Sequence, residues 1–155
     1  MKLLLAFILA AFFGFTSLDA AAAAGGSGYD PAANPASALN TALDQAKTSH
    51  RKVLVIAGGD WCRWCLILNS FWDKNPEVKA ELDRTFVVVK VYFGEDNTND
   101  SFFSKLPRAK GYPHFWVMSP DGVTTHSIDT GRLENGHDSY DKSEVLRFIR
   151  EVGAS

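Results

Sequence analysis

The chain has 155 residues, of which 46% are hydrophobic and 22% are charged, and this composition is typical of one globular domain with its own core. The net charge is −2, without a basic excess or a basic amphipathic stretch, which excludes nucleic acid and a membrane surface as expected partners. We therefore expect a monomeric domain that acts on other molecules.

Residues 1–24 predict a secretory signal peptide. Lys2 is followed by an apolar run from Leu3 to Phe13, which is too short to cross a bilayer comfortably, and then by small residues. The position of the cleavage site stays open, and an uncleaved N-terminal anchor is the alternative. Residues 25–36 are rich in Ala, Gly and Pro and predict a flexible leader. We expect an exported protein that has no membrane contact after cleavage.

Residues 37–155 predict one domain in which helices and strands alternate. Apolar residues at helical spacing favour a helix over 37–50. The branched apolar run 53–57 indicates a strand that is buried on both faces, as in a parallel sheet. Asp60 then caps an expected helix that begins near Trp61.

The second half of the domain continues the alternation and adds a hairpin. The expected elements are a helical turn at 76–82, a strand at 86–93, a short helical piece at 102–106 within the polar stretch 94–111, strands at 115–118 and 123–128 around a turn at 119–122, and a helix at 143–152. This order predicts an α/β fold with a central mixed sheet of about four strands, and helices must cover both faces of so apolar a sheet.

The chain has only two cysteines, Cys62 and Cys65. A bridge between them closes nearly the shortest possible loop, so it adds little to stability and calls for a chemical role. Cys62 is expected in the first turn of a helix, where the positive end of the helix dipole favours the thiolate that attacks disulfides. Cys65 lies on the same face, nearly one turn later, and is expected to resolve the mixed disulfide.

Four neighbouring residues are candidates for tuning the pair or for binding its substrate. Arg63 favours the Cys62 thiolate and Asp60 opposes it, and their balance stays open, as does the interpretation of Arg63 as a solvated surface charge. Trp61 and Trp64 are candidates for an apolar rim that shields the sulfur and receives a peptide. Ordinary packing is the alternative for both tryptophans.

Other uses of a Cys-x-x-Cys pair fit the sequence less well. A structural zinc site needs four ligands, and the chain has no second cysteine pair and no histidines at metal-type spacing, although a folded site that recruits His114 stays an alternative. Covalent haem attachment requires a histidine directly after Cys65, where the chain has Leu66. We therefore expect no metal and no cofactor other than the redox-active disulfide.

The chain resembles the thioredoxin superfamily, and most closely the short exported thioredoxin-like proteins of the bacterial periplasm and the ER lumen. The resemblance lies in the strand 53–57, the motif Trp61-Cys62-x-x-Cys65, the triplet Gly111-Tyr112-Pro113, the Asp121-Gly122 hairpin and the closing helix. It implies a three-layer α/β/α sandwich, with Cys62 as nucleophile and Cys65 as resolving cysteine. It also implies a cis-proline, Pro113, that faces the pair.

The resemblance further implies protein thiols and disulfides as substrates and an unidentified redox partner. It makes the periplasm the first expectation for location, with secretion or the ER lumen as alternatives. A cis-proline exposes the backbone of Tyr112, to which an extended substrate can add as a strand. Thioredoxin carries a buried Asp where this chain has Ile56, and Arg63-Trp64 replaces its Gly-Pro dipeptide, so the direction of electron flow stays open. We favour a reductase, with a non-catalytic client-binding module as the alternative function.

Overall fold

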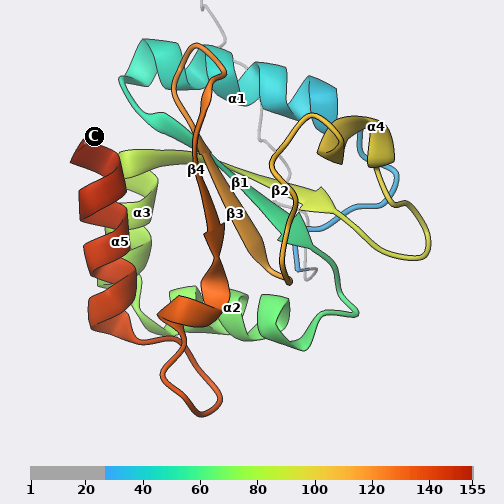
Figure 1. Ribbon diagram of the computed structural model, residues 1–155. Coiled ribbons are helices and arrows are strands. Elements are labelled where there is room, and N and C mark those ends of the chain that lie inside the picture. Colours follow the sequence, from blue (N-terminus) through green and yellow to red (C-terminus); the bar gives the residue numbers. More distant parts are fainter. Residues whose placement is uncertain (1–26, 155) are drawn as a thin grey trace, which may run out of the picture.

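The computed structural model describes residues 27–154 (Figure 1). In chain order its elements are α1 (Pro35–Ser49), β1 (Lys52–Gly58), α2 (Arg63–Lys74), α3 (Pro76–Thr85), β2 (Phe86–Tyr92), α4 (Asp100–Phe103), β3 (His114–Met118), β4 (Thr124–Asp129), the 3-10 helix η1 (Thr130–Leu133) and α5 (Lys142–Ala154). The expected signal peptide lies outside the described residues. None of the helices in the described range is long and apolar enough to cross a bilayer.

The four strands form one mixed sheet in the order β2-β1-β3-β4. Strand β1 runs parallel to β2 and antiparallel to β3, and β3 runs antiparallel to β4. In this register Ile56, near the end of β1, lies opposite Lys90 on β2 and Phe115 on β3. The predicted mixed four-stranded α/β fold with flanking helices is therefore confirmed.

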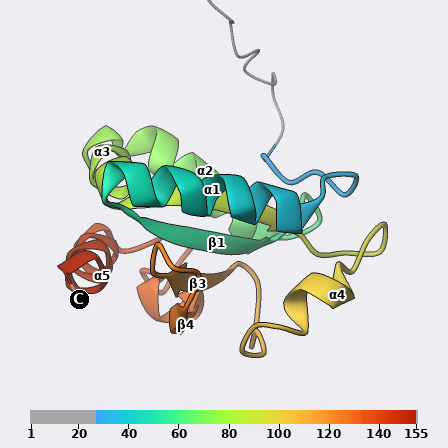
Figure 2. The same ribbon diagram turned by 90° about the horizontal axis from the view of Figure 1, so that it is seen from above.

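Helices pack on both faces of the sheet because successive side chains of a strand point to opposite sides. Leu54 and Ile56 of β1 join the core cluster that contains the buried residues of α2, α3 and α5. Val53 and Val55 join a second cluster, with Ala46 of α1. Figures 1 and 2 show α1 along the sheet, and α3 and α5 side by side at one edge of the molecule. In this three-layer arrangement, the two ends of β1 lie at the periphery of the domain.

The short helix expected in the polar stretch after β2 is present, but it begins and ends a few residues earlier than expected. Helix α4 covers Asp100–Phe103 instead of 102–106. Phe102 from this helix is buried among the residues that cover the α1 face of the sheet. The stretch therefore contributes one buried aromatic side chain to the core, and the partly buried Phe103, Leu106 and Ala109 pack against it.

The N-terminal segment, which we define as residues 27–34, packs against the domain. The backbone oxygen of Ser27 accepts hydrogen bonds from Asn69 Nδ2 at 2.9 Å and from Lys90 Nζ at 2.5 Å. Asn97 Nδ2 donates to the backbone oxygen of Pro31 at 2.8 Å. Tyr29 is only 7% exposed and belongs to the core cluster on the face of the sheet that α2 covers. The expectation of a flexible leader is therefore wrong for this segment, because a buried aromatic ring and three side-chain hydrogen bonds hold it.

Candidate active site

Cys62 and Cys65 form a disulfide with their Cα atoms 5.2 Å apart. The bridge lies just beyond the end of β1, at the start of α2. Cys62 is 5% exposed and Cys65 is fully buried. The two sulfurs therefore differ in access, because only Cys62 has surface that a substrate can reach.

Cys62 is itself the residue that caps α2. Its backbone is extended, and its Sγ accepts a hydrogen bond from the backbone N–H of Cys65 at 3.2 Å. The prediction that Asp60 caps this helix is wrong: the Asp60 carboxylate instead accepts a hydrogen bond from the hydroxyl of Ser27. The helix begins at Arg63, so the sulfur of Cys62 lies at the positive end of the helix dipole.

Gly58 allows β1 to end directly against the disulfide. A Cβ atom at this position would lie 2.5 Å from Sγ of Cys65 and 2.9 Å from the ring and hydroxyl of Tyr29. Real Cβ atoms do not make contacts this short, so only glycine fits. The strand end, the resolving sulfur and Tyr29 are therefore packed together without spare volume.

Three aromatic side chains, which we call the aromatic rim, lie next to the disulfide loop: Trp61, Phe93 and Tyr112. The indole N–H of Trp61 donates to the backbone oxygen of Phe93 at 2.6 Å, and the Trp61 ring meets the edge of Tyr112 at 5.7 Å. Tyr112 stacks on Phe93 at 4.7 Å. Trp61 stays 55% exposed, so a fixed apolar surface faces the solvent here.

Two hollows share Phe93 and flank the aromatic rim. One, of about 540 Å³, is lined by Trp61 and the residues after β2, including Glu95. The other, of about 710 Å³, is lined by Tyr112 and by residues between α4 and β3. The rim therefore stands between two concave surfaces that can receive neighbouring parts of an extended chain.

Pro113 lies at the same end of the sheet as the disulfide. The Tyr112–Pro113 peptide bond is cis. The next residue, His114, pairs with Ala57 at the end of β1, and the hydroxyl of Thr130 donates to the backbone oxygen of Pro113 at 2.7 Å. The sequence thus named Trp61, Tyr112 and Pro113 as substrate-binding residues, and the structure gathers all three at this end.

The residues between the cysteines lie apart from the aromatic rim. Arg63 is exposed. Trp64 is half-buried, and its ring meets the edge of Tyr140 at 5.6 Å, while the Tyr140 hydroxyl donates to the backbone oxygen of Trp64 at 3.4 Å. Trp64 therefore packs against the segment that precedes α5, and the structure does not bring it together with Trp61.

The sequence analysis missed Tyr29, which packs near Cys65, and Lys90, which contacts the Tyr29 ring. Burial raises the pKa of Tyr29, and the nearby Tyr140 and Asp60 raise it further. Lys90 lies 5.4 Å from the centre of the Tyr29 ring and donates to Asn69 Oδ1 at 2.7 Å, and burial lowers its pKa. No pattern marked Tyr29, since it is a single aromatic residue in a leader-like composition. Lys90 carried a weak signal as the only charge in an apolar strand.

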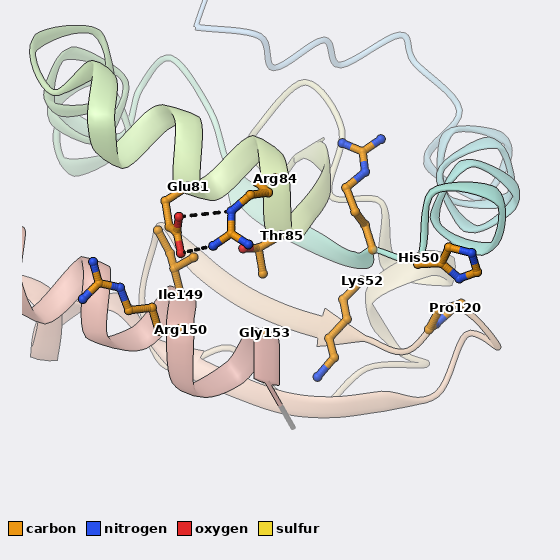
Figure 3. Close-up of a pocket in the computed structure, with 10 residues that line it drawn as sticks. His50, Lys52, Glu81, Arg84, Thr85, Pro120, Ile149, Arg150 and Gly153 are labelled. Carbon is orange, nitrogen blue, oxygen red and sulfur yellow. Dashed lines mark hydrogen bonds and ion pairs between the residues drawn. The ribbon is translucent and has the colours of Figure 1, made fainter.

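Another cleft, of about 570 Å³, lies at the opposite end of β1, where Lys52 begins the strand (Figure 3). Half of its ten lining residues are His, Arg or Lys, and it lies at the end of β1 opposite the cysteines. Within residues 27–154, no three His, Cys, Asp or Glu side chains gather as a metal site would require. The expectation of a site without metal stays a prediction.

Comparisons with known proteins place this arrangement in a family. A family model described as thioredoxin-like matches residues 34–120, more than half of the chain, and the chain belongs to this thioredoxin-like family. The disulphide isomerase of Xylella fastidiosa Temecula1 has a similar structure, with a TM-score of 0.69 and 25% identity over 80% of this chain and 95% of that one. No curated protein gives a significant match.

Two further solved structures share the fold. A thioredoxin from Thermus thermophilus has a TM-score of 0.52 and 23% identity, over 80% of this chain and 85% of that one. The C-terminal domain of Neisseria meningitidis DsbD, in the oxidised form, has a TM-score of 0.54 and 17% identity, over 75% of this chain and 94% of that one. At these identities the two structures support the fold alone.

Proposed function

We propose that the protein is a thiol–disulfide oxidoreductase that exchanges disulfides with protein substrates through Cys62 and Cys65. The observation that carries this proposal is the position of Cys62 at the N-cap of α2, bridged to a fully buried Cys65. A passive bridge over so short a loop adds little stability, whereas a sulfur at a helix N-terminus is favoured as the reactive thiolate.

The reaction follows from the unequal access of the two sulfurs. In the reduced protein, the Cys62 thiolate attacks a substrate disulfide, forms a mixed disulfide and releases one substrate thiolate. Cys65 then loses its proton and attacks Sγ of Cys62, which releases the second substrate thiolate. Two electrons pass from the protein dithiol to the substrate, and the Cys62–Cys65 bridge forms. The reverse sequence donates a disulfide.

The substrate is an extended segment of a protein that crosses the aromatic rim. Trp61 and Tyr112 provide the apolar surface, and the two hollows beside Phe93 take the flanking residues. The backbone near Pro113 offers an edge to which such a segment can add as a strand. Arg63 and Asp60 tune the charge near Cys62. No cofactor beyond the disulfide is needed.

The likeness to the Xylella disulphide isomerase supports disulfide chemistry in this chain. We favour net reduction of substrates in the periplasm after removal of residues 1–24, with electrons from an unidentified redox partner. A redox potential of about −270 mV for the cysteine pair supports a reductant, and one of about −120 mV supports an oxidant.

The test is reduction of a protein disulfide by the reduced protein and by two single variants. Cys62→Ser is expected to abolish the reaction. Cys65→Ser is expected to retain the first attack and to accumulate a mixed disulfide, because the resolving thiol is missing. Undiminished turnover by Cys62→Ser contradicts the proposal.

The alternative is a client-binding module without catalysis, which the exposed aromatic rim favours. Such a module binds clients equally well when both cysteines are changed to serine, and it releases no substrate thiols. Client binding measured together with thiol release separates the two functions.

A further inference from the structure

The side chain of Tyr29, which is 7% exposed, packs against the same strand end, Gly58, as the resolving Cys65. A Cβ atom placed on Gly58 would lie 2.5 Å from Sγ of Cys65 and 2.9 Å from the Tyr29 hydroxyl, so both groups border the same small volume. Both residues belong to the core cluster on the α2 face of the sheet. An N-terminal segment thus brings a polar atom to the most enclosed part of the candidate site.

Cys65 needs such a polar group when it reacts. Its thiol must become a thiolate in a fully buried position, and burial disfavours that charge. Strand β1 supplies no carboxylate there, since the residue near its end is the aliphatic Ile56. A hydrogen bond from a buried donor lowers the free energy of a buried anion, and bonds to charged groups are the stronger ones.

We propose that Tyr29 is a positioning residue whose hydroxyl donates a hydrogen bond to the Cys65 thiolate while Cys65 resolves the mixed disulfide. This inference rests on the proposed function. Cys65 loses its proton to water, and its sulfur attacks Sγ of Cys62. The bond between Cys62 and the substrate sulfur breaks, and the electron pair leaves with the substrate sulfur, which takes a proton from water. Tyr29 keeps its proton throughout.

The surroundings of Tyr29 suit a donor that does not ionise. Lys90 faces its ring from β2, while Asp60 lies in the loop before α2 and Tyr140 in the segment before α5. Burial and the two acidic neighbours raise the pKa of Tyr29, so the phenol stays protonated across the neutral range. Lys90 also binds the backbone oxygen of Ser27, which holds the segment that carries Tyr29.

The first experiment needs no substrate. In a Cys62→Ala background, Cys65 is the only thiol, and its ionisation is followed by ultraviolet absorbance. Tyr29→Phe is expected to shift the titration of Cys65 to higher pH, because the thiolate loses a donor. The matched control is Tyr140→Phe, which removes another buried hydroxyl, one that bonds to the backbone of Trp64. It is expected to leave the titration unchanged. An unshifted titration in Tyr29→Phe overturns the proposal.

The second experiment separates the two cysteine steps in the otherwise unaltered protein. Tyr29→Phe is expected to resolve the mixed disulfide about tenfold more slowly, the fold-change that matches loss of a hydrogen bond to a charged group. The rate at which Cys62 is alkylated is expected to stay the same. If the wild-type protein attacks no disulfide, the proposed function fails, whereas the titration of Cys65 still tests Tyr29.

Tyr29→Leu distinguishes the hydroxyl from the packing of the ring. It removes the hydroxyl and also part of the buried ring, so it is expected to destabilise the fold more than Tyr29→Phe does. Equal slowing of resolution in the two variants supports the hydrogen bond. Slowing that follows the loss of stability overturns the proposal, since Tyr29 is then only a packing residue.

Discussion

The two ends of strand β1 use their residues in opposite ways. At the Lys52 end, half of the residues that line a cleft of about 570 Å³ are basic (Figure 3). Their donors are engaged by the fold: Arg51 donates to the backbone oxygens of Asp83 at 2.8 Å and Phe86 at 3.3 Å, and Arg84 pairs with Glu81 at 2.5 Å. Arg51 thus ties the residue before β1 to the end of α3 and the start of β2, while the Arg84–Glu81 pair lies within α3.

At the Gly58 end the reactive group is the Cys62–Cys65 disulfide, which bridges two residues only three positions apart. Cys65 of the disulfide and the Tyr29 side chain pack against Gly58 without spare volume, and the exposed Trp61 packs against the next residue, Gly59. A concave basic surface therefore does not by itself mark a site of chemistry. In this molecule the candidate active site lies instead where the backbone, the disulfide and aromatic rings pack closely together.

The largest expected effect is that of Gly58→Ala at the disulfide end. The added Cβ would lie 2.5 Å from Sγ of Cys65 and 2.9 Å from Tyr29, and both neighbours are held in place. Overpacking of this kind costs about 3 kcal/mol. We expect a loss of this size in the free energy of unfolding, measured by chemical denaturation, together with slower disulfide exchange.

Gly111→Ala is the matched control, since Gly111 also lies near the site and a Cβ there would meet nothing within 4 Å. We expect its free energy of unfolding to change by no more than about 0.5 kcal/mol. Similar losses in the two variants would show that the disulfide end is not closely packed.

A smaller effect is expected from Arg51→Met at the other end of β1. The variant keeps most of the aliphatic volume and loses the two hydrogen bonds from the guanidinium group to backbone oxygens. We expect a loss of about 1 kcal/mol in the free energy of unfolding, with an unchanged rate of disulfide exchange.

Lys47→Met, at an exposed position on α1, controls for the removal of a positive charge and is expected to change neither quantity. If Arg51→Met slows exchange at unchanged stability, the basic cleft takes part in the reaction and the contrast between the two ends fails.

The parts of the fold that the sequence predicted are those with strong local signals. The apolar run 53–57 lies within β1, and the turn signal at Asp121-Gly122 joins β3 to β4, with Gly122 at a positive φ of 82°. The order of these elements was enough to predict the mixed sheet. The spacing of Cys62 and Cys65 likewise predicted a bridged pair at a helix start.

The rest depended on contacts between segments that are far apart in the sequence. Asp60 has the usual chemistry of a helix cap, but Cys62 takes that position and Asp60 pairs with Ser27. Tyr29 lies in a segment with the composition of a linker, and only the tertiary fold shows that its ring fills space beside Cys65. Composition and periodicity describe neighbours along the chain, so they carry no information about such pairs.

The smallest expected effect concerns His114, which brings pH dependence to the disulfide end. His114 is 2% exposed, its Nε2 lies 2.9 Å from the Ser127 hydroxyl, and its Nδ1 has no hydrogen-bond partner. Burial lowers its pKa, and the charge of Lys110 lowers it further, while Asp129 opposes the shift. The folded protein therefore favours the neutral ring.

The sign follows from this lowered pKa. Above the ordinary value of about 6.5, folded and unfolded chains both carry neutral His114, and its stabilising contribution is complete. As the pH falls below that value toward the lower pKa of the folded state, the unfolded chain binds the proton first, so the free energy of unfolding falls. His114→Gln is expected to show a shallower loss between about pH 7 and pH 5, measured by denaturation at each pH. If His114→Gln keeps the wild-type pH dependence of the free energy of unfolding, other groups cause the loss of stability in acid. His114 then brings no pH dependence to the disulfide end of β1.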